Sequence, residues 1–290
     1  MAVAVSRKPR PRKKSNRLAD SLRAPDSATL PSAQIDALSG DPNFMTSLAR
    51  GLCVIQCFSH ATSFLTVSQL SRATGLSRAA VRRCLYTLNK LGLADSEDGT
   101  HFTLLPRILT LGHSYISSMP LARVAQPVLD RLSQVLRESC SIAMRDGHDM
   151  IHVAHSNVSR VLAIDLSMGS RLPDIYTSMG RALLAYLPAK DLEAHLARAE
   201  FFAHTRYSIT DVNRLRQALD VVRRSGFAVV DQELELGLCA MAIPLRNSEG
   251  KVIAALNVGA PAQRVSARDL VTNFLPHLQA AAQELSMLLK

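Results

Sequence analysis

The 290-residue sequence contains no tryptophan and no apolar run that approaches the length of a membrane span. A transmembrane helix needs about 20 consecutive, mostly apolar residues, so no membrane partner is expected. The N-terminus opens with scattered charges and prolines, which argues against a signal peptide. Apolar residues still make up 47% of the chain, enough for ordinary hydrophobic cores.

Cysteine is scarce and has no metal-binding spacing. The five cysteines are an odd number, and Cys53 and Cys57 lie one helical turn apart without a second ligand pair nearby. A disulfide framework and a cysteine zinc site are therefore not expected. Free thiols in a protein core are the simplest interpretation, and they predict a reduced, cytoplasmic protein.

Histidine offers only a weak indication of a metal. His148, His152 and His155 are close in sequence, but positions 152 and 155 of a regular strand point to opposite faces. No cysteine or carboxylate pair completes a tetrahedral set around them. The sequence therefore predicts neither a metal site nor a cofactor.

Catalytic signatures are also missing. The chain has no Gly-x-Ser-x-Gly elbow, no phosphate-binding loop and no dinucleotide fingerprint. We accordingly predict no catalytic residue and no enzymatic activity. An enzyme with an attached DNA-binding domain stays as an alternative, as does an architectural DNA-binding protein without a ligand.

Positive charge is present in excess and is concentrated at one end. Residues 1–40 carry eight Lys and Arg against three Asp and Glu, and residues 41–117 carry seven against four. The remaining 173 residues are nearly balanced, with nineteen against seventeen. This asymmetry indicates a polyanion partner at the N-terminal end.

The segment between Leu65 and Leu104 has the pattern of a winged helix-turn-helix. Thr66 to Gln69 fits a capping box for a first short helix, and Gly75 ends that helix. Ser77 can cap the second helix. Asp98-Gly99 then supplies the turn of a two-stranded wing.

The second of these helices has the two faces that a recognition helix needs. Val81, Cys84, Leu85 and Leu88 recur at three- and four-residue steps and define a buried stripe. The exposed side and N-terminal end are then free to enter the major groove of double-stranded DNA. The predicted DNA-binding residues are Ser77, Arg78, Ala79, Arg82, Arg83 and Tyr86.

The whole chain is predicted to divide into four parts. Residues 1–40 are expected to form a disordered basic tail, whose Arg7–Lys14 run could touch DNA phosphates or merely solubilise the protein. Residues 41–105 form the DNA-binding domain, with a first helix from Thr46 to His60 whose Leu48, Leu52, Ile55 and Phe58 face inward. Residues 106–118 form a linker helix with an apolar face that could pair with a second copy.

Residues 119–290 are expected to form a second domain of α+β class around one central antiparallel sheet. The predicted helices are Leu121–Arg137, Ser178–Leu187, Lys190–Ala199, Asp211–Ser225 and a closing helix from Ser266. The predicted strands are Cys140–Asp146, Met150–Ser156, Val161–Ser167, Phe227–Val230, Cys239–Leu245 and Val252–Asn257.

Several long segments resemble the IclR family of bacterial transcriptional regulators, in particular regulators of protocatechuate and β-ketoadipate catabolism. The resemblance covers about Gly40 to Lys290 and is carried by GDPNFMTSLARGLCVIQCF (40–58), RAAVRRCLYTLNKLG (78–92), LLPRILTLGHSYISS (104–118), YTSMGRALLAYL (176–187) and VVDQELELGLCAMAIPL (229–245). It implies a GAF-like effector-binding domain, a homodimer or homotetramer, and control by a small dicarboxylic or aromatic acid. The function implied is an activator of β-ketoadipate pathway genes with β-ketoadipate as effector. Protocatechuate and 4-hydroxybenzoate are the alternatives.

The resemblance also indicates where the effector binds. Thr177 and Ser178 can cap the helix that begins there, and free N–H groups at a helix N-terminus favour an anion. Gly180 would let a ligand approach the backbone, and Arg181 has no acidic neighbour close in sequence. The Cys239–Ile243 strand should lie opposite. The predicted effector-binding residues are Thr177, Ser178, Met179, Gly180, Cys239, Ala240, Met241 and Arg160, with Arg171 as another candidate cation.

Asn257 and the acidic run Asp231–Glu235 are not expected to contact the effector. Asn257 is predicted to serve in packing or hydrogen bonding. Carboxylates that line a pocket for an acid would repel it, so most of the acidic run should cap, pair or face solvent.

Overall fold

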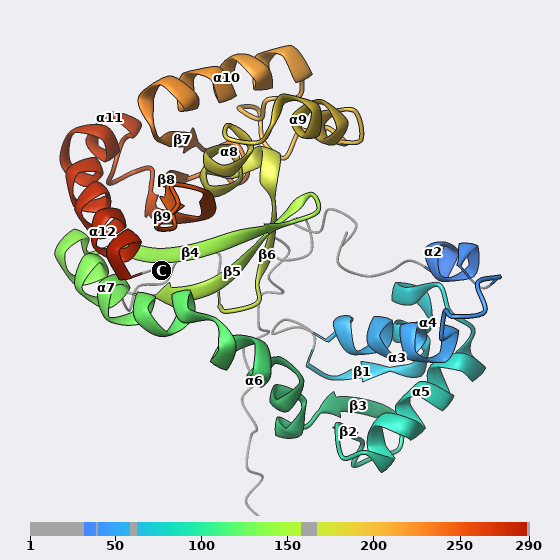
Figure 1. Cartoon of the computed structure of the whole chain (residues 1–290). Helices are drawn as coiled ribbons and strands as arrows, with labels where there is room; N and C mark the ends of the chain where they lie inside the picture. The colour runs from blue at the N-terminus through green and yellow to red at the C-terminus, as the bar shows by residue number, and fades with distance from the viewer. Residues whose placement is uncertain (1–31, 39, 59–62, 158–166, 289–290) are drawn as a thin grey trace, which may run out of the picture.

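A computed structural model describes residues 32–38, 40–58, 63–157 and 167–288 of the chain. The DNA-binding end and the larger C-terminal domain are joined by helices (Figure 1). None of the helices within these ranges is long and apolar enough to cross a membrane.

The N-terminal domain is a winged helix-turn-helix, as predicted. Its elements are the helices α2 (Ser32–Ala37), α3 (Thr46–Gln56), α4 (Val67–Thr74) and α5 (Arg78–Lys90), and the strands β1 (Leu65–Thr66), β2 (Ala94–Asp95) and β3 (His101–Leu104). The three short strands pair antiparallel in the order β1-β3-β2.

The local signals of this domain act as the sequence indicates. Thr66 and Gln69 form a complete capping box at the start of α4. Gly75 ends α4 in the left-handed conformation with a φ of 74°, and the Ser77 hydroxyl accepts the Ala80 N–H at the start of α5. In the wing, the carboxylate of Asp98 accepts the backbone N–H groups of Thr100 and His101.

Two features of this end differ from the predictions. Residues 32–37 form helix α2, and Ile35 is fully buried against α3, so ordered structure begins before position 41. Residues 1–31, which make up most of the predicted tail, lie outside the described residues. In α3 the buried residues are Ala49, Cys53 and Val54, whereas Leu48 and Leu52 are exposed.

The prediction of the inward face of α3 was therefore wrong for Leu48 and Leu52, whereas Ile55 and Phe58 pack against the core as predicted. The periodicity of leucines predicted burial because leucine usually packs inside, but α3 buries its smaller side chains against α2 and α5. Leu48 and Leu52 are left on the surface, where a single chain does not cover them.

The linker continues from the wing into the second domain. It consists of the 3-10 turn η1 (Pro106–Ile108), the helix α6 (Leu109–Ser118) and the helix α7 (Pro120–Leu136). In Figure 1 these green helices run from the lower right to the C-terminal domain. Leu109, Leu111 and Tyr115 on α6 are exposed, as expected for an uncovered apolar face.

The C-terminal domain is built on a six-stranded antiparallel sheet with the order β6-β5-β4-β9-β8-β7. Its strands are β4 (Ser139–Asp146), β5 (Asp149–Ser156), β6 (Arg171–Pro173), β7 (Ala228–Asp231), β8 (Leu238–Arg246) and β9 (Val252–Pro261). Its remaining helical elements are η2 (Asp174–Tyr176), α8 (Ser178–Leu184), α9 (Ala189–Leu196), α10 (Val212–Ser225), α11 (Ala267–Asp269), the π-helical turn η3 (Leu270–Phe274) and α12 (Leu275–Leu288).

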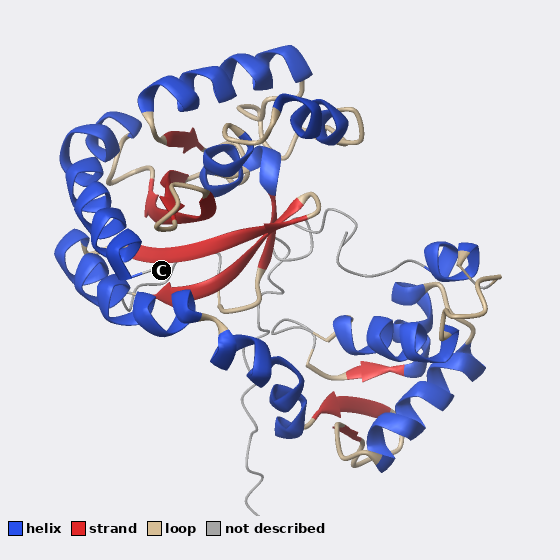
Figure 2. Ribbon diagram, viewed as in Figure 1, coloured by secondary structure: helices blue, strands red, loops and turns tan. Residues whose placement is uncertain are grey.

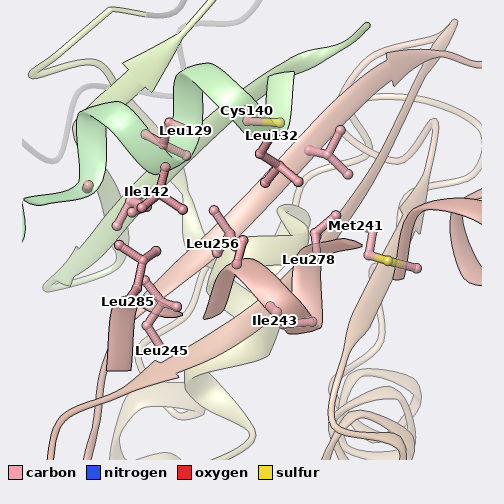
Figure 3. Packing of buried hydrophobic residues seen from close by; sticks show 14 of the residues in the cluster. Leu129, Leu132, Cys140, Ile142, Met241, Ile243, Leu245, Leu256, Leu278 and Leu285 are labelled. Carbon is pink, nitrogen blue, oxygen red and sulfur yellow. The ribbon is translucent and has the colours of Figure 1, made fainter. Parts of the chain in front are cut away.

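Helices cover both faces of this sheet (Figure 2). One core lies between the sheet and helices α7 and α12, and Figure 3 shows Leu129 and Leu132 of α7 beside Leu278 and Leu285 of α12. The other core lies under α8, α9 and α10 and includes Met179, Leu196 and Leu219. The predicted α+β class with one central antiparallel sheet is confirmed.

The element bounds differ most around the predicted effector helix. Helix α8 ends at Leu184, so it has seven residues and a correspondingly small dipole. Strand β9 extends to Pro261, four residues beyond its predicted end. The predicted Val161–Ser167 strand falls almost entirely outside the described residues, and β6 begins later, at Arg171.

Candidate functional site

The exposed face of α5 has the chemistry of a DNA-binding surface. Val81, Leu85 and Leu88 are buried, which leaves Arg82 and Arg83 in solvent on other sides of the helix. Across the described ranges, no ion pair with a carboxylate neutralises either guanidinium. Two unpaired arginines near the start of a protruding helix can reach phosphates or base edges.

The other predicted contacts surround these arginines. Arg78 and Ala79 are exposed in the first turn after the Ser77 cap, and Tyr86 is exposed one turn further along. The ammonium of Lys90 lies 5.4 Å from the centre of the Tyr86 ring, so this part of α5 is also cationic. The structure thus places all six predicted residues at exposed positions of α5 or at its N-cap.

The C-terminal domain contains an internal cavity between the sheet and the start of α8. Its volume is about 130 Å³, comparable with the ~150 Å³ of an apolar cavity that holds benzene. The size suits one aromatic ring or a short acyl chain. The lining residues are Ser139, Ser141, His155, Asn157, Leu172, Tyr176, Thr177, Ser178, Met179, Val230, Leu234, Glu235, Leu236, Gly237, Leu238, Ala240, Asn257 and Gly259.

A buried hydrogen-bond chain forms one wall of the cavity. The Ser178 hydroxyl donates to Oδ1 of Asn257 over 2.8 Å, and Nδ2 of Asn257 reaches the Ser141 hydroxyl at 3.5 Å. Because α8 begins at Ser178, the amide N–H groups of Ser178 and Met179 have no intrahelical acceptor. Donors and hydroxyl groups at one end of a small cavity can hold a carboxylate.

A carboxyl group lies on the cavity wall as well. Glu235 is only 7% exposed, and burial raises the pKa of its carboxyl group. A proton on Glu235 would let it donate a hydrogen bond, and an ionised Glu235 would accept one. This residue belongs to the acidic run that was expected to stay away from the effector.

Four of the predicted effector residues line the cavity and three do not. Thr177, Ser178, Met179 and Ala240 are part of its wall. Cys239 and Met241 alternate with Ala240 along β8 and point into the core under α7 and α12 (Figure 3). Arg160 lies outside the described residues.

Gly180 has a different role from the predicted one. It does not line the cavity, and a Cβ atom there would lie 2.0 Å from the carbonyl oxygen of Asp174. Glycine is thus required for close packing of α8 on η2. The Thr177 hydroxyl accepts the Gly180 N–H and caps α8 as expected.

The two arginines considered near the cavity are already paired. Arg181 is 3% exposed and binds Glu233 through two hydrogen bonds of 2.6 and 2.7 Å, although it has no acidic neighbour close in sequence. Its partner is distant in sequence and adjacent only in the fold. Arg171 binds both Asp146 and Asp149 on the neighbouring hairpin. Glu233 confirms the expectation that part of the acidic run pairs.

The histidines of β5 also differ from expectation. A register shift between Ile142 and Ala143 inserts an extra residue into β5, so His152 and His155 share a face. Their rings meet edge to face at 6.5 Å between centres. His155 lines the cavity, whereas His152 is fully buried and its pKa is lowered by burial to about 4.

Comparison with protein families agrees with this architecture. Residues 47–98 match the IclR helix-turn-helix domain, and residues 113–287 match the C-terminal domain of bacterial IclR transcriptional regulators. The chain belongs to the IclR family. Members of this family are transcriptional regulators, which confirms the expectation of a DNA partner and no enzymatic activity.

Relatives of this IclR regulator include regulatory proteins from other bacteria. It is 48% identical to the Pca regulon regulatory protein of Pseudomonas putida over 93% of this chain and 92% of that protein. A crystal structure of the putative transcriptional regulator RHA06195 from Rhodococcus sp. RHA1 has 43% sequence identity to this chain and a TM-score of 0.75. The match covers 85% of this chain and 98% of that one.

A further relative carries a ligand. The inducer-binding domain of the Acinetobacter regulator PobR, a double mutant in complex with 3-hydroxybenzoic acid, is 34% identical with a TM-score of 0.55. The match covers 57% of this IclR chain and 97% of that domain. This chain is therefore a ligand-responsive, IclR-type transcriptional regulator related to the Pca and PobR regulators.

Sequence reasoning missed most of the polar cavity wall of this IclR regulator. Ser139, Ser141 and Asn157 come from the ends of β4 and β5, which are adjacent to α8 only after the sheet forms. Asn257 fills its predicted hydrogen-bonding role and also lines the cavity. The unusual density of serine around positions 139–141 was the one available signal.

Proposed function

We propose that this protein controls genes of the β-ketoadipate pathway, as an activator, in response to β-ketoadipate bound in the cavity of the C-terminal domain. The cavity beside the start of α8 is the observation that carries the proposal. A DNA partner also implies that the protein works in the cytoplasm of the bacterium.

The polar wall of the cavity supports an acid as ligand. One carboxylate of the effector would accept from the N–H groups of Ser178 and Met179 and from the Ser141 hydroxyl. The short α8 helix contributes a small dipole, so these direct hydrogen bonds must supply most of the binding. Micromolar affinity needs about 8 kcal/mol in total, which requires the apolar wall of Leu172, Leu234 and Leu238 as well.

The 48% identity to the Pca regulon regulatory protein supports β-ketoadipate as the first candidate. Glu235 would then bind the second carboxylate of the effector in its protonated form, because two facing anions repel. Arg160, which follows the cavity residue Asn157 closely in sequence, remains our proposed cation for this end.

A hydroxybenzoate or protocatechuate is the second candidate, favoured by two observations. The PobR relative was crystallised with 3-hydroxybenzoic acid. A ring hydroxyl can also donate to an ionised Glu235 at the far end of the cavity. The two candidates therefore require opposite protonation states of the same residue.

We also propose that the protein acts as a homodimer or tetramer. Leu48 and Leu52 on α3, and Leu109 and Leu111 on α6, are exposed apolar side chains near the DNA-binding end. A second copy would remove this surface from water. Light scattering on Leu109→Lys and Leu111→Lys should show dissociation, and an unchanged mass would exclude α6 from the interface.

Calorimetry on the full-length protein tests the effector assignment. β-Ketoadipate, 4-hydroxybenzoate and protocatechuate are titrated separately, with adipate as a control that lacks the keto group. We expect one ligand per chain and a weaker response in Ser178→Ala. Binding that is identical in the parent, Ser178→Ala and Ser141→Ala would place the effector elsewhere.

Binding alone does not separate activation from repression. A reporter fused to the promoter of the neighbouring catabolic operon should gain expression when the effector is added, and only when the regulator is present. Loss of repression in a strain without the regulator would contradict the proposed role as activator.

A further inference from the structure

Three potential metal ligands meet at a place remote from the effector cavity. His148 lies in the turn between β4 and β5, Asp174 begins η2, and His195 lies near the end of α9. One ligand atom from each side chain lies within 4.8 Å of the other two. None of the three residues lines the effector cavity.

Two of these side chains are deeply buried and face each other. Asp174 is 1% exposed and His195 is 8% exposed. Oδ2 of Asp174 lies 2.8 Å from Nε2 of His195, and neither atom has a second hydrogen-bond partner among the described residues. Polar atoms with unused hydrogen-bonding capacity are costly inside a protein, so this pair is a candidate for binding a further group.

His148 completes the group from the solvent side. Its ring stacks on the ring of His195 with 4.0 Å between centres and an angle of 21°. His148 is half-buried, so this side of the group is in contact with solvent.

We propose that His148, Asp174 and His195 bind a divalent transition-metal ion, with Zn²⁺ as the first candidate and water as a fourth ligand. Two imidazole nitrogens and one carboxylate oxygen form a donor set that suits zinc, whereas Ca²⁺ and Mg²⁺ prefer oxygen ligands alone. Metal–ligand distances of about 2.0–2.2 Å place tetrahedral ligand atoms roughly 3.3 Å apart. The present spacing of 2.8 to 4.8 Å therefore needs a rotation of the half-buried His148 ring.

One neighbouring charge opposes the metal. Nη1 of Arg145 lies 3.4 Å from Nδ1 of His195 and also donates to the carbonyl of Gly147. A metal on Nε2 of His195 leaves its proton on Nδ1, which then cannot accept from the guanidinium. Arg145 is exposed and its side chain can turn into solvent. Its charge should therefore lower the affinity for the metal ion without blocking the site.

The site is connected to the effector cavity through Asp174. The Asp174 N–H donates to the carbonyl of His148, and the next residues of the chain, Tyr176 to Ser178, form the cavity wall. A metal on Asp174 would fix η2 against the β4–β5 turn and α9. It would thereby hold the start of α8 in place whatever effector the cavity binds.

Metal binding to the full-length protein tests this proposal directly. Metal-free protein is titrated with Zn²⁺ against a competing chelator and with Co²⁺, whose visible absorption reports coordination geometry. We expect one tetrahedral ion per chain without a thiolate-to-cobalt band, because no cysteine belongs to the group. His148→Ala should weaken binding by more than the ~10–100-fold that loss of an outer-shell partner causes.

Two further variants make the result specific. His204→Ala removes another half-buried histidine whose Nε2 lacks a partner, outside the group, and should leave the affinity unchanged. Arg145→Ala should increase the affinity. His148→Ala is preferred to Asp174→Asn because Asp174 is buried in the domain core and its loss can disturb folding.

Other results would overturn the proposal. Zinc affinity equal to that of the parent in both His148→Ala and His195→Ala would place the ion elsewhere. A thiolate band would assign it to the cysteines. Absence of stoichiometric binding by the parent would leave Asp174 and His195 as a hydrogen-bonded pair.

Discussion

Helices α5 and α8 lie at the two functional ends of the chain and are held in opposite ways. Only Val81, Leu85 and Leu88 are buried in the 13-residue α5, whereas all seven residues of α8 are buried. Helix α5 is capped by Ser77 and follows a glycine turn, so its form depends on neighbours in sequence. Helix α8 depends on Asn257 and Glu233, which are distant in sequence and which the fold brings to it.

The difference agrees with what each helix is proposed to bind. DNA approaches α5 from outside, so its arginines stay in solvent and contribute little to folding. A small effector must be enclosed, so the residues at the start of α8 contribute to the core and to the cavity together. Substitutions should therefore separate binding from stability in α5 and combine them in α8.

The largest expected effect is the loss of the buried ion pair of α8. Arg181→Met leaves the Glu233 carboxylate buried without its partner, and breaking such a pair costs about 3–5 kcal/mol. Chemical denaturation should show this loss in the C-terminal domain. The double variant Arg181→Met with Glu233→Leu should recover much of it, because the uncompensated charge is gone.

Gly180→Ala tests the close packing of α8 on η2. The added methyl group would meet the Asp174 carbonyl, and overpacking of this kind costs about 1–3 kcal/mol or more. Effector response should fall as a consequence of the displaced η2. Gly112→Ala is the matched control, since a Cβ atom there meets nothing within 4 Å. Equal stability of Gly180→Ala and the parent would contradict this packing argument.

Arg82→Ala and Arg83→Ala test the other side of the comparison. Loss of an arginine that reads a base should cost about 1–3 kcal/mol of specific binding and relax preference at one base pair. Unfolding free energy should change by less than about 0.5 kcal/mol, because both side chains are exposed. Fluorescence anisotropy with operator and random DNA measures the binding. Unchanged affinity for both DNAs in both variants would show that α5 is not placed in the groove.

These contrasts show which parts of the molecule the sequence could predict. The capping box at Thr66, the Gly75 turn and the wing at Asp98 are encoded within a few residues, and the structure confirms them. The pairing of Arg181 with Glu233 and the cavity wall at Ser141 and Asn257 join residues far apart in sequence. No local pattern contains that information.

Some local patterns in the sequence predicted the wrong burial or orientation of side chains. Leucine spacing wrongly predicted that Leu48 and Leu52 of α3 face inward, although Ile55 and Phe58 of the same pattern do pack against the core. Strand alternation predicted opposite faces for His152 and His155, and one inserted residue in β5 reversed the result. Periodicity predicts the buried face of an element only where the strand register is regular and where the apolar side chains pack within the same chain.

Glu235→Gln distinguishes the two classes of effector. Burial raises the pKa of Glu235, so the folded protein holds this proton more tightly than the unfolded chain, and the associated stability is lost as pH rises through the raised pKa. Binding of a dicarboxylate should weaken over the same rise in pH, because ionised Glu235 repels it. Glu235→Gln should remove this pH dependence and preserve dicarboxylate affinity at high pH.

A hydroxybenzoate should respond to the same variant in the opposite sense. Its ring hydroxyl would lose an ionised acceptor, which is worth about 1.5–3 kcal/mol. Calorimetry at several pH values with both ligands measures the difference. Glu233→Gln is unsuitable as a control because it breaks the Arg181 pair, whereas Asp231→Asn changes an exposed carboxylate of the same acidic run. An identical pH profile in the parent and Glu235→Gln would remove this residue from the effector site.

The smallest expected effect concerns the predicted basic tail, which we expect to contact DNA through charge alone. Helix α2 packs Ile35 into the domain, so the informative deletion is residues 1–31, which leaves this contact intact. If Arg7–Lys14 binds phosphates, deletion should weaken DNA binding at low salt and reduce the slope of log affinity against log salt by about 0.9 per lost contact. The ratio of affinities for operator and random DNA should not change, because phosphate contacts carry no sequence information. Binding at a single salt concentration would hide this effect, so the salt series decides, and an unchanged slope would exclude the tail from the DNA contact.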